Sequence, residues 1–458
     1  MVGSNSLRTK DIQSLLHPFT NLALQERNGP LVLRSGRGAT VFDESGKDYI
    51  EGMAGLWCAS LGFSENKIAE AIAKQCDELP FYHLFNGKAH VAAIELADRL
   101  KQIAPAAMAK VFFGSSGSDA NDTAVKIVWY YNNVLGRPRK KKIIARHQAY
   151  HGTSISAASL SGLANNHRLF DLPIPNILHT ECPHHYRFAE PGENEEQFAT
   201  RLAEKLEDLI VAEGPDTIAA FIAEPVMGAG GVIIPPQTYF ARIQKVLEKY
   251  DILLIADEVI CGFARTGSMW GSETFGMRPD IVTCAKAITG GYLPLSATMI
   301  TEPIYRALMG GSNSVGAFAH GYTYSGHPLA TAAGLATLAI YEEIDVVSVA
   351  RRASKRFLER LHGFADHPLI GETRGVGLVG AIELTSDRAK RQPFPPQRGF
   401  GNAVVQAAQA HGVILRAMVN DTISFCPPLT ISDDEIDIMF DRFGAALEHV
   451  AAHQHAAE

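Results

Sequence analysis

Short apolar runs alternate with amphipathic segments between about residues 105 and 300. Pro236–Tyr250 carries apolar side chains at helical spacing, whereas the runs around it are brief and almost wholly apolar. These runs are Val111–Phe113, Lys142–His147, Thr217–Glu224, Ile252–Val259 and Asp280–Ala285. Strands buried on both faces of a parallel sheet have this composition, and the helices between them cover the sheet. The pattern predicts an α/β domain built on a mostly parallel sheet with helices on both faces.

Both ends of the chain show a different pattern. Residues 30–56 predict short antiparallel strands, and a long alanine-rich helix is predicted over His327–Ile344. The tail after it mixes helices with strand-like runs at Gly377–Leu384 and Val413–Ala417, and Ser432 followed by Glu435 forms a capping box that opens a last helix. We therefore expect a smaller α+β domain built from both chain ends, namely residues 1–60 and 331–458. Residues 61–330 would form the large domain.

Length and charge narrow the class of protein. A chain of 458 residues is too long for one compact domain. Its composition is that of an ordinary globular protein, with 46% hydrophobic and 20% charged residues. The formal net charge of −7 argues against nucleic acid or an anionic membrane as the main partner. We interpret the one basic run, Arg137–Lys142, as a solvated connecting loop.

The cysteines and the N-terminus indicate the compartment. The six cysteines are scattered without a C-x-x-C pair, which is typical of reduced thiols in the cytosol rather than of a disulfide framework. The first residues contain no apolar segment of the kind found in secretory signals, and no window approaches the roughly 18 uninterrupted apolar residues of a membrane span. We expect a soluble, cytoplasmic protein without a membrane partner.

Two charged residues that follow apolar runs carry the first candidate chemistry. Asp257 ends the run ILLIAD, where open α/β sheets place their ligands; the alternative is an aspartate that caps the next turn. Lys286 lies between the apolar segments DIVTCA and AITGGY, so burial should lower its pKa and leave a neutral, nucleophilic amine. The alternative is a strand-end lysine whose ammonium reaches solvent. Together the two residues suit a cationic ring partnered by an anion and an aldehyde captured by an amine.

The stretch GSSGSDAN, Gly114–Asn121, runs from a predicted strand end into a predicted helix. Free backbone N–H groups at a helix start favour a phosphate, and the glycines allow it to approach closely. No G-K-[ST] follows, so the stretch is not a Walker loop. The alternative is a plain tight turn with Ser118 as the helix N-cap.

Two further patterns predict no site. Gly375–Gly380 matches G-x-G-x-x-G, but a strand-like run follows it instead of a helix, and no first βαβ unit precedes it. We therefore expect no dinucleotide site there. Cys182-Pro183-His184-His185 has no second cluster at ligand spacing, so we interpret it as an ordinary loop and expect no metal.

Six motifs occur along the chain in the order GSSGSDAN, HQAYHG, AEPVMGAGG, LLIADEVICGFARTG, CAKAITGGYLPLSA and YTYSGHPLA. Together they resemble the class III, or ω-type, aminotransferases of fold type I, which use pyridoxal 5′-phosphate (PLP). The resemblance spans nearly the whole chain, from HPFTN near residue 17 to the last helix. It implies a large domain with a mostly parallel seven-stranded sheet flanked by helices, together with a smaller α+β domain.

The resemblance implies a role for each motif residue toward the cofactor. Lys286 would form the covalent aldimine (a Schiff base) with PLP and shuttle a proton, and Asp257 would pair with the pyridinium nitrogen. Tyr150, counted with them as catalytic, would lie over one ring face and Val259 against the other, with Glu224 nearby. The residues that would hold the phosphate are Ser116, Gly117, Ser118 and Thr323, the last reaching the phosphate of the neighbouring subunit of a dimer.

The resemblance also bears on the substrates. The glutamate that pairs with a substrate-site arginine in ornithine and 4-aminobutyrate aminotransferases is replaced here by Ala229. The stretches GMAGLWC and HPFTN resemble the amine:pyruvate and ω-amino acid:pyruvate subgroup. Arg416 would grip the carboxylate of pyruvate and swing away when an amine without a carboxylate enters. The apolar pocket would be lined by Phe19, Trp57, Ile260 and Phe85, the last from the same chain or from the partner subunit. The alternatives are core packing for the aromatic residues and a surface position for Arg416.

The implied activity is transfer of an amino group from a primary amine or ω-amino acid to an α-keto acid, pyruvate before others, by a ping-pong mechanism in a homodimer or tetramer. Other activities stay open at this point. The acceptor is 2-oxoglutarate in one alternative, and the protein is an aminomutase or decarboxylase of the same fold in another. Two further alternatives are a catalytically silent regulator with this fold and a Rossmann dehydrogenase. The misplaced glycine motif is the only support for the dehydrogenase.

Overall fold

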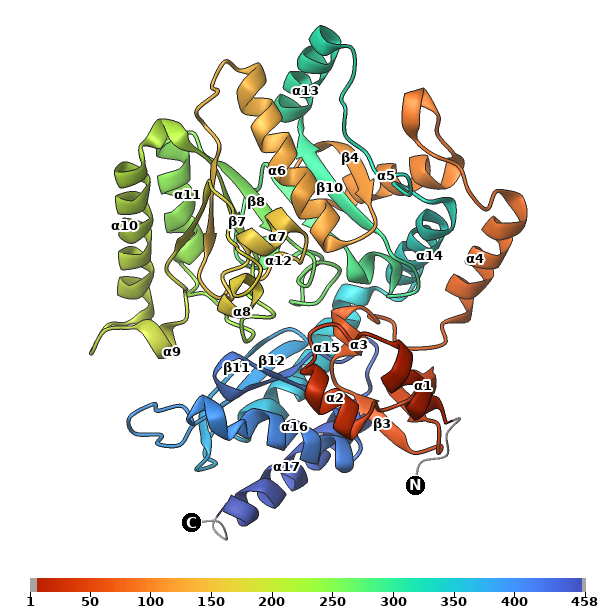
Figure 1. Cartoon of the computed structure of the whole chain (residues 1–458), viewed down its shortest axis with the longest axis vertical. Coiled ribbons are helices and arrows are strands. Elements are labelled where there is room, and N and C mark those ends of the chain that lie inside the picture. The colour runs from red at the N-terminus through yellow and green to blue at the C-terminus, as the bar shows by residue number, and fades with distance from the viewer. Residues whose placement is uncertain (1–5, 455–458) are drawn as a thin grey trace.

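A computed structural model of the chain describes residues 6–454, and its centre is a seven-stranded sheet (Figure 1). Six of the strands run in one direction, and β10 runs antiparallel to both of its neighbours. The prediction of a mostly parallel seven-stranded sheet is therefore confirmed. In spatial order the strands are β4 (Met108–Gly114), β10 (Ser296–Thr301), β9 (Ile281–Cys284), β8 (Leu253–Asp257), β7 (Ile218–Ala223), β5 (Lys142–Arg146) and β6 (Ile177–Thr180).

Helices cover both faces of this sheet. Side chains alternate along each strand, so Phe221 and Ala223 pack into one core while Ala220 and Ile222 pack into another. The helices on the first face are α5 (Val91–Ile103), α10 (Glu195–Glu213), α11 (Tyr239–Lys249) and α14 (Pro328–Glu343). Those on the second face are α6 (Gly117–Val134), α7 (Ile155–Leu160) and α13 (Glu302–Val315). The wholly apolar strand runs are explained by this burial on both sides.

The two ends of the chain meet in the lower half of Figure 1. The predicted N-terminal strands are present, and a strand from the C-terminal part pairs with them in parallel. This sheet consists of β1 (Leu33–Arg37), β2 (Thr40–Asp43), β3 (Asp48–Glu51) and β13 (Val413–Ile414). A second, antiparallel sheet consists of β11 (Ile370–Val376), β12 (Val379–Leu384), β15 (Thr422–Phe425) and β14 (Arg416–Met418).

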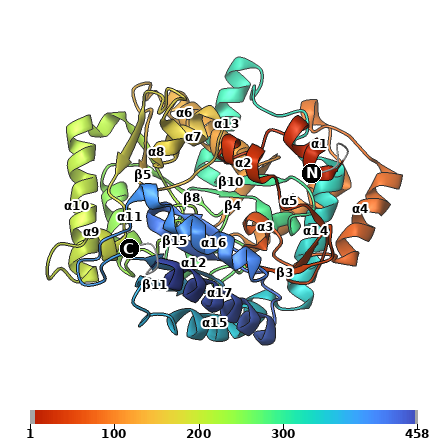
Figure 2. The same cartoon turned by 60° about the horizontal axis from the view of Figure 1, so that its bottom comes forward.

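Three long helices pack with these two sheets and lie side by side in Figure 2, namely α15 (Val346–His362), α16 (Phe400–Ala410) and α17 (Asp433–Gln454). The predicted capping box opens α17, because the Glu435 N–H donates to Ser432 Oγ at 3.3 Å and the Ser432 N–H donates to Glu435 Oε2 at 2.9 Å. The other helices are α1 (Leu7–Ser14), α2 (Leu22–Asn28), α3 (Ala54–Trp57), α4 (Asn66–Glu78), α8 (Ala164–His167), α9 (His185–Phe188) and α12 (Gly271–Thr274).

The run Val413–Ala417 does not form one strand. Val413 and Ile414 pair with β3, whereas Arg416 and Ala417 pair with β15, so the chain changes sheet at the buried Leu415. The glycine run 375–380 spans the tight connection between the antiparallel strands β11 and β12. No helix within residues 6–454 is both long enough and apolar enough to cross a membrane.

Candidate active site

The structure brings Asp257 and Lys286 to the same edge of the large sheet. Asp257 is the last residue of β8 and pairs in register with Thr283 of β9. Lys286 follows β9 and begins the short helix η3 (Lys286–Thr289) with a left-handed φ of 53°. The carboxyl ends of parallel strands are the usual ligand-binding edge of such sheets. The edge predicted from the two apolar runs is thus a candidate site.

The amine of Lys286 is enclosed without a polar partner. Within residues 6–454 it has no hydrogen bond or ion pair, and the face of Trp57 lies 5.2 Å from Nζ. Burial lowers the pKa of Lys286, and the nearby Cys58 and Asp257 oppose this only in part. A lowered pKa increases the fraction of neutral amine, which is the nucleophilic form. The direction predicted from the sequence is confirmed.

Two polar side chains hold the carboxylate of Asp257. Its Oδ2 accepts hydrogen bonds from Asn121 Nδ2 at 2.8 Å and from His151 Nδ1 at 2.7 Å, while Oδ1 accepts from the Val259 N–H at 3.1 Å. Asp257 is only 3% exposed, so these contacts fix its orientation in a nonaqueous setting. A buried, oriented carboxylate is suited to hold a cationic ring nitrogen.

The start of α6 forms a close cradle beside Asp257. Its N-cap is Ser116, whose Oγ accepts from the Asp119 N–H at 3.1 Å, so the alternative of a Ser118 N-cap is wrong. The hydroxyl of Ser118 instead accepts from the Thr153 N–H at 3.0 Å. A Cβ on Gly117 would lie 3.0 Å from Val259 Cγ1, so a larger residue here would press on Val259. Free N–H groups at the start of a long helix favour an anion.

Glu224 joins two segments of the site. Its Oε1 accepts from the Tyr150 N–H at 3.0 Å, and its Oε2 accepts from the Gly228 N–H at 2.9 Å. Burial raises the pKa of Glu224, and the nearby His151 partly offsets this. Tyr150 is itself partly buried, and burial raises the pKa of its phenol. Through its two hydrogen bonds, the carboxylate of Glu224 therefore fixes the backbone of Tyr150 against the turn that follows β7.

Trp57 lies close to both Lys286 and Arg416. Its ring lies 5.2 Å from Lys286 Nζ and 5.3 Å from Arg416 Cζ, and it is 4% exposed. The turn that carries it is unusual, because Ala54 and Trp57 both have left-handed φ values, 47° and 60°. Burial lowers the pKa of Arg416, which within residues 6–454 has no side-chain hydrogen bond or ion pair. The alternative of a surface position does not hold, since Arg416 is only partly exposed.

The apolar candidates differ in their positions. Ile260 and Ala229 are buried, and a Cβ on Gly228, next to Ala229, would lie 2.4 Å from Ile260 Cδ1. Phe19 is 67% exposed and meets Tyr150 edge to face, with the ring centroids 6.3 Å apart. Phe19 therefore lies beside Tyr150, whereas Ile260 lies beside the turn at Gly228.

The structure does not join Phe85 and Thr323 to this cluster within one chain. Phe85 lines a separate hollow of about 820 Å³ between the Leu84–Asn86 segment and residues 316–321. A Cβ on Gly321 would lie 3.0 Å from Phe85 Cζ, and Thr323 is exposed two residues further on. The surface around them is aromatic, with Phe81 and Tyr324 also exposed.

Asn121 and His151 are the functional candidates that sequence reasoning missed. Both lie in motifs that carry the family resemblance, GSSGSDAN and HQAYHG, yet neither was assigned a role. Their contact with Asp257 joins residues 136 and 106 positions apart. Only the fold reveals such a pairing.

The groups at this edge fit PLP. The helix start with its glycine cradle suits the phosphate, the oriented carboxylate of Asp257 suits the ring nitrogen, and the unpaired amine of Lys286 suits the aldehyde. Fold and site together define a PLP-dependent transferase. Residues 22–447 match the family model described as Aminotransferase class-III, and the chain belongs to this family. It is an aminotransferase that uses PLP, with a small-molecule amine and a keto acid as substrates.

Similar proteins of known name agree with this family. The chain is 48% identical to gamma aminobutyrate transaminase 3, chloroplastic, of Solanum lycopersicum, over 98% of this chain and 86% of that protein. It is 48% identical to a vanillin aminotransferase of Capsicum frutescens, over 95% of this chain and 94% of that protein. The solved structure of an omega transaminase from Pseudomonas jessenii in complex with PMP matches with a TM-score of 0.96 and 52% identity, over 98% of this chain and 99% of that one.

Proposed function

We propose that this aminotransferase moves an amino group from a primary amine or ω-amino acid to pyruvate by a ping-pong mechanism. The observation that supports this most is that the amine of Lys286 and the guanidinium of Arg416 both lie close to the ring of Trp57, at 5.2 and 5.3 Å. Lys286 serves the chemistry. The guanidinium of Arg416, which has no hydrogen-bond or ion-pair partner within residues 6–454, offers a planar fork for the carboxylate of a keto acid. The apolar surroundings favour a small acceptor with one carboxylate over a dicarboxylate, because each further charge must be desolvated.

We propose a role toward the cofactor for each of these residues. PLP supplies an electron sink for the charge left when the substrate carbon loses its proton. Lys286 would hold the cofactor through its amine and would accept that proton, because a neutral amine is a base. Asp257, held by Asn121 and His151, would keep the ring nitrogen protonated. Tyr150, fixed by Glu224, would pack against one face of the ring and Val259 against the other. The phosphate would be held by Ser116, Gly117, Ser118 and the neighbouring subunit's counterpart of Thr323.

For the amine donor we propose a pocket lined by Phe19, Trp57 and Ile260, closed by Phe85 of a second copy. Ala229 places no carboxylate in this wall, so an amine without a second charged group meets no unpaired anion there. Gamma-aminobutyrate is a donor to test, because several similar proteins are named for it.

We propose that the protein acts as a homodimer or as a tetramer built from such dimers. The exposed aromatic surface with Phe85 and Thr323 supports this, since neither residue joins the site of its own chain. We retain the division into residues 1–60 with 331–458 and residues 61–330 as two domains, and a cytoplasmic location, on the sequence arguments given above.

Replacing Arg416 by Ala tests the assignment of the acceptor. A charge-assisted hydrogen bond contributes about 1.5–3 kcal/mol, so the variant should raise KM for pyruvate by roughly ten-fold or more. KM for a simple monoamine donor should change far less, because that substrate has no carboxylate. Steady-state kinetics with each substrate varied in turn gives both values, and Arg352→Ala, an exposed arginine on α15, is the control. Equal effects on both substrates would contradict the role of Arg416.

A further inference from the structure

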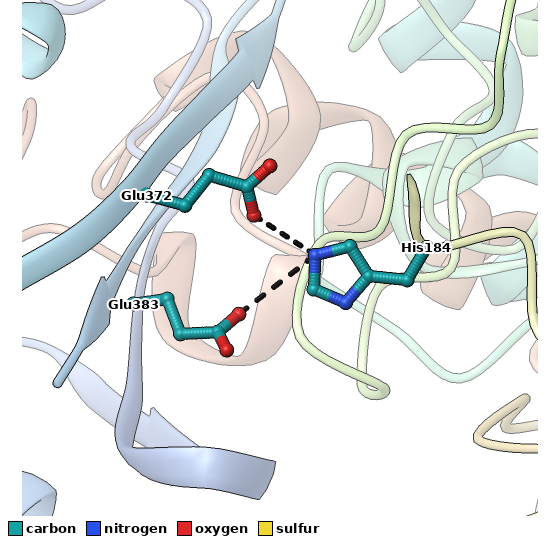
Figure 3. A group of neighbouring side chains, drawn as sticks. All are labelled: His184, Glu372 and Glu383. Atoms are coloured by element: carbon teal, nitrogen blue, oxygen red, sulfur yellow. Dashed lines mark hydrogen bonds and ion pairs between the residues drawn. The ribbon is translucent and has the colours of Figure 1, made fainter. Parts of the chain in front are cut away.

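A cluster of charged side chains lies outside the site described above, between the loop that carries α9 and the strands β11 and β12. Figure 3 shows His184 facing Glu372 and Glu383 from two neighbouring strands, with both carboxylates directed at the same imidazole nitrogen. His184 Nε2 lies 2.8 Å from Glu372 Oε2 and 3.8 Å from Glu383 Oε2. Glu383 is 1% exposed at its side chain, so this is a buried network.

Two arginines compensate the two carboxylates. Arg374 Nη1 donates to Glu383 Oε2 at 2.7 Å and also to Glu372 Oε2, and Arg187 donates to the other oxygen of Glu383. His184, Glu372 and Glu383 have ligand atoms within 4.8 Å of one another, an arrangement that would suit a divalent metal. The guanidinium of Arg374, however, already contacts both carboxylate oxygens that face the imidazole. The geometry favours a structural network centred on Arg374.

The remaining donors of Arg374 point at the backbone of the turn that follows β7. Nη2 donates to the Gly231 carbonyl at 2.6 Å, and Nε donates to the carbonyls of Gly231 and Val232 at 3.1 Å each. Arg374 is 7% exposed, so these bonds form away from bulk water. The guanidinium of Arg374 therefore binds two carboxylates, on β11 and β12, and also two main-chain carbonyls in the turn that follows β7.

This turn has a conformation that needs support. Gly231 and Val232 have φ values of 120° and 51°, and for the β-branched Val232 the left-handed region costs on the order of 1 kcal/mol or more. The turn is closed by bonds from the N–H groups of Gly231 and Val232 to the Gly228 carbonyl, at 3.0 and 2.9 Å. Arg374 holds the two carbonyls that this conformation presents outward.

The same turn forms part of the active-site wall. Gly228 donates to Glu224, which accepts from Tyr150, and Gly228 packs on Ile260. Ala229 lies between Gly228 and the residues that Arg374 binds. A displacement of the turn would therefore move Ala229 and the surface beside Ile260.

We propose that Arg374, fixed by His184, Glu372 and Glu383, is a positioning residue that holds the Gly228–Val232 turn and thereby sets the shape of the amine-binding pocket. This inference rests on the proposed function of that pocket. It predicts that loosening the network changes which amines are accepted more than it changes the chemistry itself.

The test compares Arg374→Lys, which keeps the charge and loses the planar fork, with the wild-type holoenzyme. The first readout is hydrogen exchange of the backbone amides of residues 228–233, measured with and without cofactor. We expect exchange about ten-fold faster or more at Gly231 and Val232 in the variant. The matched control is Arg356→Lys, an arginine of the same domain that binds the Asp437 carboxylate with two nitrogens away from the turn. It should leave exchange in the turn unchanged.

The second readout is the donor half-reaction, followed by the loss of the cofactor absorbance with amine and no acceptor. For a bulky amine such as 1-phenylethylamine, we expect the half-saturating concentration to rise about ten-fold more than for 2-aminopropane. The maximal rates should stay within about three-fold of wild type, because the lysine–aspartate core is untouched. His184→Gln, a milder change that leaves Arg374 in place, should shift both readouts in the same direction by less.

Two results would overturn the proposal, namely unchanged exchange in the turn or equal effects on both amines in Arg374→Lys. If that variant does not fold, the same two criteria are applied to His184→Gln. Failure of the proposed function looks different, because wild-type holoenzyme would then show no loss of the cofactor band with any amine.

Discussion

Among the single residues, Lys286 has the greatest consequence for activity. Its amine makes no hydrogen bond within residues 6–454, so Lys286→Ala removes little that the fold needs. We expect this variant to keep its circular dichroism spectrum, to bind PLP without a covalent bond and to show no measurable transamination. The control is Lys245→Ala, an exposed lysine on α11 that should keep full activity. Turnover of Lys286→Ala at the wild-type rate would remove the residue from the mechanism.

A second residue gives a dependence of stability on pH. Glu51 is 3% exposed, and burial raises its pKa to about 7, although the Gly55 and Met53 N–H groups lower it in part. A carboxyl whose pKa is raised by folding takes up its proton more readily in the native state. Its contribution to stability is complete below the unfolded pKa and is lost as the pH rises through about 7.

Glu51→Gln keeps an oxygen for the Gly55 N–H but does not ionise. Between pH 5 and pH 8 the free energy of unfolding of wild type should therefore fall by about 2–3 kcal/mol more than that of Glu51→Gln. Thermal unfolding of the apoprotein at both pH values gives this comparison. A difference between the two proteins that stays constant from pH 5 to pH 8 would contradict the assignment.

At the scale of elements, the start of α6 gives a prediction about the cofactor. A Cβ on Gly117 would lie 3.0 and 3.1 Å from the two methyl carbons of Val259, so Gly117→Ala must displace the residue proposed to contact the ring. We expect PLP to bind roughly ten-fold more weakly, while the apoprotein melts as wild type does. The control is Gly310→Ala on α13, where a Cβ would meet nothing within 4 Å. An unchanged dissociation constant for PLP would contradict the cradle.

The strands of the large sheet were predictable from the sequence because both of their faces are buried. The runs Thr217–Glu224 and Ile252–Val259 contain β7 and β8 to within two residues at either end. Short, wholly apolar runs in an α/β domain are typical of strands covered by helices on both faces. The tail was less predictable. Val413–Ala417 reads as one strand, yet the chain turns from one sheet to another inside it, and no local property of Leu415 signals this.

At the scale of the whole molecule, the parts of the candidate site that could be predicted are the residues at the ends of predicted strands. Asp257 and Lys286 were assigned correctly to the carboxyl edge because position along the chain determines position in a parallel sheet. The partners of Asp257 and the network of Arg374 were not, because they join distant segments through side chains. Sequence reasoning interpreted Cys182–His185 as an ordinary loop and missed the contact that His184 makes with β11.

We propose that this class III aminotransferase passes an amino group from an amine to pyruvate through PLP bound to Lys286. The most direct test is the absorbance spectrum of the protein loaded with PLP, recorded again after an amine is added and once more after pyruvate. We predict that the cofactor band disappears with the amine and returns with pyruvate. A band that returns only with 2-oxoglutarate would contradict the acceptor, and folded protein with no such band at all would contradict the role of Lys286.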